Sequence, residues 1–173
     1  MALVLNGSGT IQSDDITLSG NANVTGTMTS TGAFTSTGVL TSSAGIYLGG
    51  TASANLLDDY EEGTWTPTVT AQSGTLGSYT LTNCKYVRIG QLVNIMGKVK
   101  VTSVGTGSDA LRLSLPFVTT NVDFSGSGAE RTTLGYQCAV FGENTGLNIR
   151  KYDFTTVINL DHEIKFSATY LIN

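Results

Sequence analysis

Three consecutive hexapeptides over residues 25–42, TGTMTS, TGAFTS and TGVLTS, repeat the formula Thr-Gly-x-apolar-Thr-Ser. In this frame the apolar slot recurs at a strict spacing of six and holds Ile16, Ala22, Met28, Phe34, Leu40 and Ile46. An α-helix needs apolar spacings of three and four, and a half-buried strand needs alternation. A period of six predicts a short strand, a corner and another short strand, as in a β-helix. We expect the glycine at the corner, because it turns without a Cβ penalty.

The number of repeats also predicts an assembly. One chain carries about six hexads, enough for about two coils of a three-sided β-helix, whereas stacked repeats need at least three units to bury a core. Three chains wound together remove this difficulty, because each chain supplies one side of every layer. We therefore predict a homotrimeric stalk with an axis lined by Ile16, Met28, Phe34, Leu40 and Ile46. The alternative is a Gly/Ser/Thr-rich linker without fixed structure.

Composition favours a rigid all-β protein with an uncharged polar surface. Charged residues make up 13% of the chain, well below the share usual in soluble domains. No basic cluster is dense enough to bind a nucleic acid, and no apolar stretch approaches the length of a membrane span. The start, MALVLNGSG, has no positively charged region and too short an apolar run for a signal peptide. We expect the chain to fold in a cytoplasm.

From Thr66 onward the pattern is that of strands. Apolar and polar residues alternate in several segments, for example at Leu111, Leu113 and Leu115. We expect strands over 66–71, 79–89, 91–102, 110–116, 132–141, 147–151, 154–160 and 163–172. Short strands at this density, with glycine-rich turns, predict an antiparallel β-sandwich that resembles a jelly roll. The predicted fold class is therefore all-β, a trimeric hexad-repeat stalk followed by a sandwich head.

An acidic cluster over residues 58–63, DDYEEG, separates stalk from head. We predict a β-helical stalk over residues 1–57, an acidic junction over 58–65 and a β-sandwich head over 66–173. The junction is expected to form a turn that caps the stalk, with Leu56 and Leu57 closing its axis. The alternative is a cation site, because hard cations prefer oxygen ligands.

Other residue types indicate structural roles. We expect Cys84 and Cys138 to be free buried thiols, as is usual for cytoplasmically folded proteins. The sequence has no Cys-x-x-Cys pair and no histidine cluster, so no metal or cofactor is predicted. It also lacks the nucleophile-elbow, P-loop and zinc-protease motifs. Trp65 is expected to pack in the core or at a subunit interface, and His162 to be structural.

A longer motif begins at the acidic cluster, where residues 58–67 read DDYEEGTWTP. This segment resembles one that recurs in bacteriophage tail-fibre and tail-spike proteins where the fibre shaft meets the terminal head. Residues 86–93 (YVRIGQLV) resemble a strand pair of these heads, residues 115–117 (LPF) a turn, and residues 168–170 (ATY) the last strand. The resemblance extends over about residues 58–173.

This resemblance implies a homotrimeric virion protein of the phage tail, folded in the host cytoplasm, with a head that binds the host surface. The implied partners are a host polysaccharide or an outer-membrane receptor, and other phage tail proteins at the N-terminus. It carries no binding residues over to this chain, because such heads differ in their loops.

Three loops rich in Gly, Ser and Asn, residues 102–109, 120–131 and 142–148, are the candidate binding surfaces, because binding often resides on loops of a rigid scaffold. Aromatic rings and amides suit sugar faces and hydroxyls. We expect a glycan site, without catalysis, among Asp109, Asn121, Asp123, Phe124, Arg131, Asn144 and Asn148.

Two alternatives remain open. The first is a polysaccharide depolymerase, a glycoside hydrolase or lyase. For a hydrolase, a carboxylate pair would come from Asp109, Asp123, Glu130 and Glu143, and would flank a sugar cleft. The second is a purely structural tail-tip or cap protein, which the stalk supports as well as it supports receptor binding.

Overall fold

The computed structural model describes residues 21, 23–120, 123–143 and 146–172. The chain forms two compact units, residues 1–41 and 42–173. The helical structure in the described part is a single 3-10 turn, η1 (Ser53–Asn55). Among these residues no helix is long and apolar enough to cross a membrane.

The described hexads of the first unit have a repeating backbone conformation without strands. The chain bends at each Thr-Gly pair, at residues 25–26, 31–32 and 37–38. The Ser30 hydroxyl donates a hydrogen bond to the Gly32 carbonyl at 3.0 Å, and Ser36 repeats this bond with Gly38 at 3.0 Å. The six-residue period of the sequence is therefore present in the backbone as one corner per repeat.

The apolar side chains of these hexads are exposed in the single chain. Met28, Phe34 and Leu40 keep 64%, 58% and 62% of their surface exposed, and Ile16 lies outside the described residues. The corner glycines, Gly26, Gly32 and Gly38, have no positive φ, and a Cβ built on any of them would meet nothing within 4 Å. The expectation that these corners need the conformational freedom of glycine is therefore wrong.

The second unit begins with a small hairpin. Strand β1 (Ile46–Tyr47) pairs antiparallel with β2 (Leu56–Leu57), so that Ile46 lies opposite Leu57. The acidic segment that follows, expected to be a capping turn, is instead strand β3 (Tyr60–Thr64). Because β3 pairs with β5, Glu61 and Glu62 belong to the edge of the main sheet, whereas Asp58 and Asp59 directly precede it.

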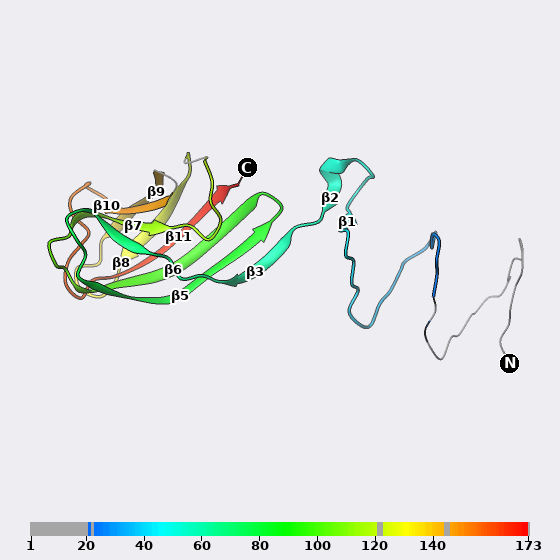
Figure 1. Cartoon of the computed structure of the whole chain (residues 1–173), viewed down its shortest axis with the longest axis horizontal. Helices are drawn as coiled ribbons and strands as arrows, with labels where there is room; N and C mark the ends of the chain where they lie inside the picture. The colour runs from blue at the N-terminus through cyan, green and yellow to red at the C-terminus, as the bar shows by residue number, and fades with distance from the viewer. Residues whose placement is uncertain (1–20, 22, 121–122, 144–145, 173) are drawn as a thin grey trace, which may run out of the picture. The chain divides into compact units, whose positions relative to one another are not determined.

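The rest of the unit is one antiparallel sheet of nine strands that curls strongly into a half-barrel (Figure 1). The strand order is β3-β5-β6-β11-β8-β9-β10-β7-β4. The all-β prediction is confirmed, but the expected sandwich of two sheets is replaced by one continuous sheet. After β3, its strands are β4 (Val69–Ser73), β5 (Ser78–Ile89), β6 (Leu92–Ser103), β7 (Ser108–Ser114), β8 (Ser125–Glu130), β9 (Gln137–Glu143), β10 (Gly146–Lys151) and β11 (Glu163–Leu171).

Two strand predictions are wrong. β8, with the sequence SGSGAE, falls in the segment 120–131 that was expected to be a loop. It has no apolar alternation, because neighbouring strands approach Gly126 and Gly128 so closely that a Cβ would meet Ala168 at 2.8 Å and Val140 at 3.0 Å, respectively. Conversely, residues 154–160 form no strand, and their apolar signal comes from the buried loop residues Val157 and Ile158.

The core fills the inner face of the half-barrel. It includes alternate residues of β6, β7, β9, β10 and β11, together with Val157 and Ile158. Trp65 packs edge-on against Phe166, with ring centroids 6.2 Å apart, and donates its indole N–H to the Ser114 carbonyl. Cys84 and Cys138 are free and buried, as predicted.

The sheet has two ends, which decide where loops can act together. We call the end at Tyr60 the proximal end; it also carries the turn at residues 90–91 and the connection 115–124. The opposite, distal end carries the turns at 74–77, 104–107 and 131–136 and the connection 152–162. Backbone hydrogen bonds join these distal segments, for example Arg131 N–H to the Glu163 carbonyl and Asp161 N–H to the Val101 carbonyl.

Candidate binding surfaces

The predicted binding residues do not come together at one place. Asp109 and Arg131 lie toward the distal end, whereas Asp123 and Phe124 lie toward the proximal end. Asn148 lies within β10, and Asn121 and Asn144 lie outside the described residues.

Three of these residues have structural partners. The Asp109 carboxylate forms an ion pair with Arg150 at 3.2 Å. The Phe124 ring packs on Tyr170 with centroids 5.3 Å apart. Asn148 is 1% exposed and accepts a hydrogen bond from Arg112 Nε at 3.2 Å. Of the five predicted residues that the structure describes, Arg131 and Asp123 are exposed.

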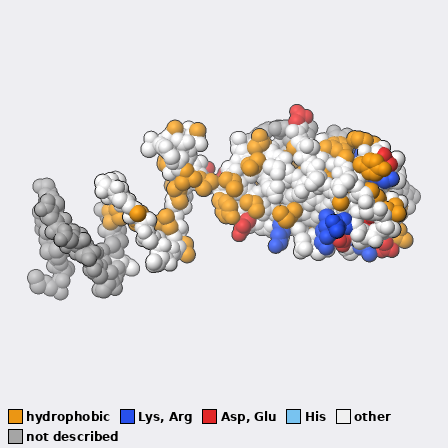
Figure 2. All heavy atoms as spheres, turned by 180° about the vertical axis from the view of Figure 1, so that it is seen from behind, with side chains coloured by type: hydrophobic (Ala, Val, Ile, Leu, Met, Phe, Trp, Pro, Cys, Tyr) orange, Lys and Arg blue, Asp and Glu red, His pale blue; other side chains and the backbone are white. Residues whose placement is uncertain are grey.

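A different set of apolar side chains is exposed on two distal loops, and we call it the distal patch. Its members keep between 58% and 70% of their surface exposed, and they are Leu134, Tyr152, Phe154 and Leu160. The two loops are joined by a hydrogen bond from the Thr132 hydroxyl to the Asp161 carbonyl at 3.2 Å. Figure 2 shows hydrophobic side chains at this end beside acidic and basic ones.

The first loop of the distal patch is built around a buried carboxylate. Glu130 is fully buried at the end of β8, and its two oxygens accept hydrogen bonds from the backbone N–H groups of Thr132, Thr133, Leu134 and Gly135 and from the Thr132 hydroxyl. Burial opposes ionisation of this carboxyl, but the hydrogen bonds outweigh it and lower the pKa of Glu130 to about 2. The ionised side chain therefore fixes the shape of the turn 131–135.

The second loop is ordered by short polar contacts. The Asp153 carboxylate accepts hydrogen bonds from the hydroxyl and the backbone N–H of Thr155, and the hydroxyl bond is the main cause that lowers the pKa of Asp153 to about 2. Lys151 Nζ lies 5.4 Å from the Tyr136 ring and 5.6 Å from the Tyr152 ring. The exposed rings are thus presented by loops with defined geometry.

Sequence reasoning missed the distal patch, because it assigned residues 132–141 and 154–160 to strands. A signal was present at residues 153–155, since an Asp followed two residues later by Thr is typical of a side-chain-stabilised turn. For Leu134 and Leu160 the sequence offers no signal of exposure.

A second exposed apolar surface crosses the sheet at the proximal end. Four directly paired residues on neighbouring strands β3, β5, β6 and β11 form what we call the proximal row, Tyr60, Ile89, Leu92 and Leu171. Each keeps between 45% and 61% of its surface exposed. The row lies on the outer face, because the next residue of β6, Val93, is fully buried. A continuous apolar row across four strands is typical of a surface that another protein covers.

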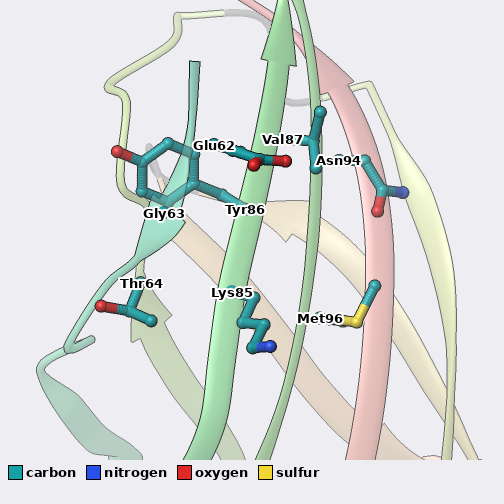
Figure 3. A pocket seen from close by; sticks show the side chains of 8 residues that line it. All are labelled: Glu62, Gly63, Thr64, Lys85, Tyr86, Val87, Asn94 and Met96. Carbon is teal, nitrogen blue, oxygen red and sulfur yellow. The ribbon is translucent and has the colours of Figure 1, made fainter.

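A shallow depression of about 360 Å³ lies beside the proximal row, on the outer face of β3, β5 and β6 (Figure 3). Its outer-face side chains come from three neighbouring strands and are Glu62, Thr64, Lys85, Val87, Asn94 and Met96. Asn94 is already engaged, since its amide donates to the Thr169 hydroxyl at 2.8 Å. The mixture of one acid, one base and apolar groups defines no reaction and no ligand class.

The carboxylates proposed for a depolymerase are not assembled into a pair. Asp109 is neutralised by Arg150, and Glu130 is saturated with hydrogen bonds. Asp123 lies toward the other end of the sheet, and the side chain of Glu143 lies outside the described part of the chain. Within the described residues, no three His, Cys, Asp or Glu side chains lie together as metal ligands.

Comparisons with known proteins identify no relative of this chain. No protein-family model, no curated protein and no solved structure matches this chain.

Proposed function

We propose that the chain is the subunit of a homotrimeric bacteriophage tail-fibre or tail-spike protein. Its hexads form a trimeric β-helical stalk, and its C-terminal head, residues 66–173, binds a host cell-surface receptor. The receptor is a glycan, which the head binds without cleaving it. The N-terminal residues attach the protein to other tail proteins of the virion.

The main support for this proposal comes from the hexads. Their backbone repeats with a period of six, yet Met28, Phe34 and Leu40 remain more than half exposed. A periodic row of exposed apolar side chains is unfavourable in water, at about 25 cal/mol for each Å². Neighbouring copies of the chain would cover this row, and they would also give the corner glycines a reason to lack a Cβ.

The proximal row supports the same assembly. It offers four adjacent apolar side chains on the outer face, next to the point where the chain enters the sheet at Tyr60. A neighbouring head in a trimer would bury this surface. The resemblance of residues 58–67 to the shaft-to-head junction of phage fibres supports the same arrangement.

The distal patch supports receptor binding rather than a purely structural cap. Exposed Tyr152 and Phe154 rings on ordered loops offer flat surfaces on which sugar rings can stack. Each such site would be weak, because a small patch buries little surface and must order a flexible ligand. Three linked heads would raise the overall avidity by about 10² or more.

The test is adsorption of fluorescently labelled protein to a panel of bacterial strains, before and after enzymatic removal of their surface polysaccharide. We expect strain-specific adsorption that is lost with the polysaccharide, and no release of sugar fragments. Replacing both Tyr152 and Phe154 with Ala should reduce adsorption about tenfold or more, the equivalent of about 1.4 kcal/mol. The control Val118→Ala changes a 78% exposed residue outside the distal patch and should adsorb normally.

Four results would contradict the proposal. A monomeric folded protein would overturn the trimer. Release of sugar fragments from host polysaccharide would favour the depolymerase. Normal adsorption of the Tyr152/Phe154 variant would place binding elsewhere, and a trimer that adsorbs to none of the strains would favour the structural cap.

A further inference from the structure

The outer face of β8 forms a shallow groove of about 300 Å³, which we call the β8 groove. β8 contributes only small side chains to this face, Ser127 and Ala129. Longer side chains stand on the flanking segments, with Gln137 on β9, Lys165 on β11 and Arg131 just beyond the end of β8. The groove therefore forms because the small side chains of β8 lie between the longer side chains of its neighbours.

The groove has an excess of positive charge. Arg131 lies opposite Glu163, as the 3.2 Å hydrogen bond from Arg131 N–H to the Glu163 carbonyl indicates. The Glu163 carboxylate, however, pairs with Lys98 at 3.4 Å. Among the described residues, the side chains of Arg131 and Lys165 have no ion pair or hydrogen bond. The Glu163 carboxylate thus neighbours Arg131, Lys98 and Lys165. Its direct cross-strand partner, Lys100, pairs instead with Asp161 at 3.0 Å.

The register makes this arrangement unfavourable without a ligand. Lys165 and Lys98 are direct partners across the β11–β6 pair, and like charges at directly opposite positions destabilise a sheet. Arg131 is the diagonal neighbour of Lys165 across the β11–β8 pair, because Lys165 lies opposite Ala129. Diagonal neighbours are about 7 Å apart, so that one small anion can contact both side chains.

The chemistry of the groove selects a class of ligand. A guanidinium group donates two parallel hydrogen bonds to a carboxylate, and an ammonium group adds a second positive charge. The Ser127 and Ser167 hydroxyls, 3.5 Å apart, and the Gln137 amide can bind neutral hydroxyl groups. We infer that the β8 groove binds a carboxylate-bearing sugar unit of an acidic polysaccharide.

This inference rests on the proposed function for the biological source of the sugar, but the binding chemistry is independent of it. The groove includes Arg131 and the end of the sequence-based candidate segment 120–131, and it lies outside the distal patch. It therefore adds a charged subsite to a head with exposed aromatic side chains at its distal end.

The experiment measures binding of tetragalacturonate to the full-length protein by NMR or calorimetry, with maltotetraose as the neutral probe and glycerol phosphate as the phosphate probe. We expect tetragalacturonate to bind about tenfold or more tightly than either, because charge-assisted hydrogen bonds are stronger than neutral ones. Raising the salt from about 50 to 300 mM should weaken the binding. Backbone signals of β8 and β11 should shift.

Arg131→Gln and Lys165→Gln should each lower the affinity for tetragalacturonate about tenfold. The matched control is Lys100→Gln, which removes one positive charge from the same face. In the wild type Lys100 lies outside the groove and pairs with Asp161 at 3.0 Å. The control should keep the affinity within about twofold. Equal affinity for maltotetraose, tighter binding of glycerol phosphate, or unchanged affinity in the Arg131 and Lys165 variants would overturn the inference.

The outcomes separate this inference from the proposed function. If the trimer adsorbs to cells but tetragalacturonate does not bind, the groove assignment fails and the proposed function stands. If tetragalacturonate binds in the groove but no strain is recognised, the groove assignment stands and the receptor-binding function fails.

Discussion

The backbone N–H of Leu134 donates a hydrogen bond of 2.8 Å to the buried carboxylate of Glu130, four residues before it in the chain. This bond and four others to the same carboxylate form the turn that presents Leu134 at the surface. A charged group in the protein interior thus fixes the shape of an exposed loop.

Acid should destabilise the head through Glu130. The pKa of this carboxyl is about 2 in the folded protein, below its ordinary value of 4.5. The unfolded state therefore binds the proton more readily, and the stabilisation is present above about pH 4.5 and lost as the pH falls toward about 2. Urea unfolding between these pH values should show a falling free energy of unfolding in the wild type.

Glu130→Gln should reduce this pH dependence to the part that remains from Asp153, whose pKa is also lowered to about 2. It should also lower the free energy of unfolding by about 3 kcal/mol, because a buried amide would leave backbone donors unsatisfied. The control Glu62→Gln alters an exposed carboxylate and should change stability by about 0.5 kcal/mol or less. Equal effects of the two substitutions would show that the Glu130 turn contributes little.

Phe34→Asp should disrupt the trimer far more than Thr35→Asp. In the proposed stalk, Phe34 lies at the axis, where three carboxylates would meet without partners at a cost of several kcal/mol each. Thr35 should face water. Light scattering should give three times 18.1 kDa for the wild type and for Thr35→Asp, and less for Phe34→Asp. Equal losses would contradict the assigned frame of the repeat.

Gly32→Val distinguishes an isolated hexad chain from an assembled one. In the single chain a Cβ at Gly32 has open space and an ordinary φ, so the substitution should be harmless to a monomer. In a trimer with close chain contacts it should lower the melting temperature of the assembly. A melting temperature unchanged from wild type would indicate that no neighbouring chain packs against this corner.

Leu92→Ser should weaken association of the heads. Leu92 is 45% exposed in the single chain and lies within the proximal row, so its loss should cost about 1 kcal/mol for each interface. Sedimentation over a range of concentrations should detect more dissociated protein. Val118→Ser, outside the row, should leave the assembly unchanged, and the same behaviour in Leu92→Ser would remove the proximal row from the interface.

The two thiols should be inert in the folded protein. Burial raises the pKa of Cys84 and raises that of Cys138 to about 11, so that little reactive thiolate forms at pH 8. Ellman's reagent should detect no thiol before denaturation and two thiols per chain in guanidinium chloride. Rapid reaction of the native protein would contradict the buried environment.

The sequence by itself determined the six-residue period of the hexads, the all-β class and the longest strands. These are local properties, because the spacing of apolar residues within one segment decides which backbone conformation places all of them on one face. The period in residues 25–42 and the alternation at Leu111 and Leu113 are examples. The burial of the two thiols and the packing of Trp65 were also predictable, since both residue types favour burial.

Only the tertiary structure decided how the surface is organised. β8 has no strand pattern of its own, because its glycines are required by the close approach of Ala168 and Val140 from neighbouring strands. The proximal row and the β8 groove depend on register between strands far apart in sequence, which places Leu171 opposite Leu92 and Lys165 opposite Lys98. The sequence places such residues on strands, but cross-strand pairing alone decides which of them become neighbours.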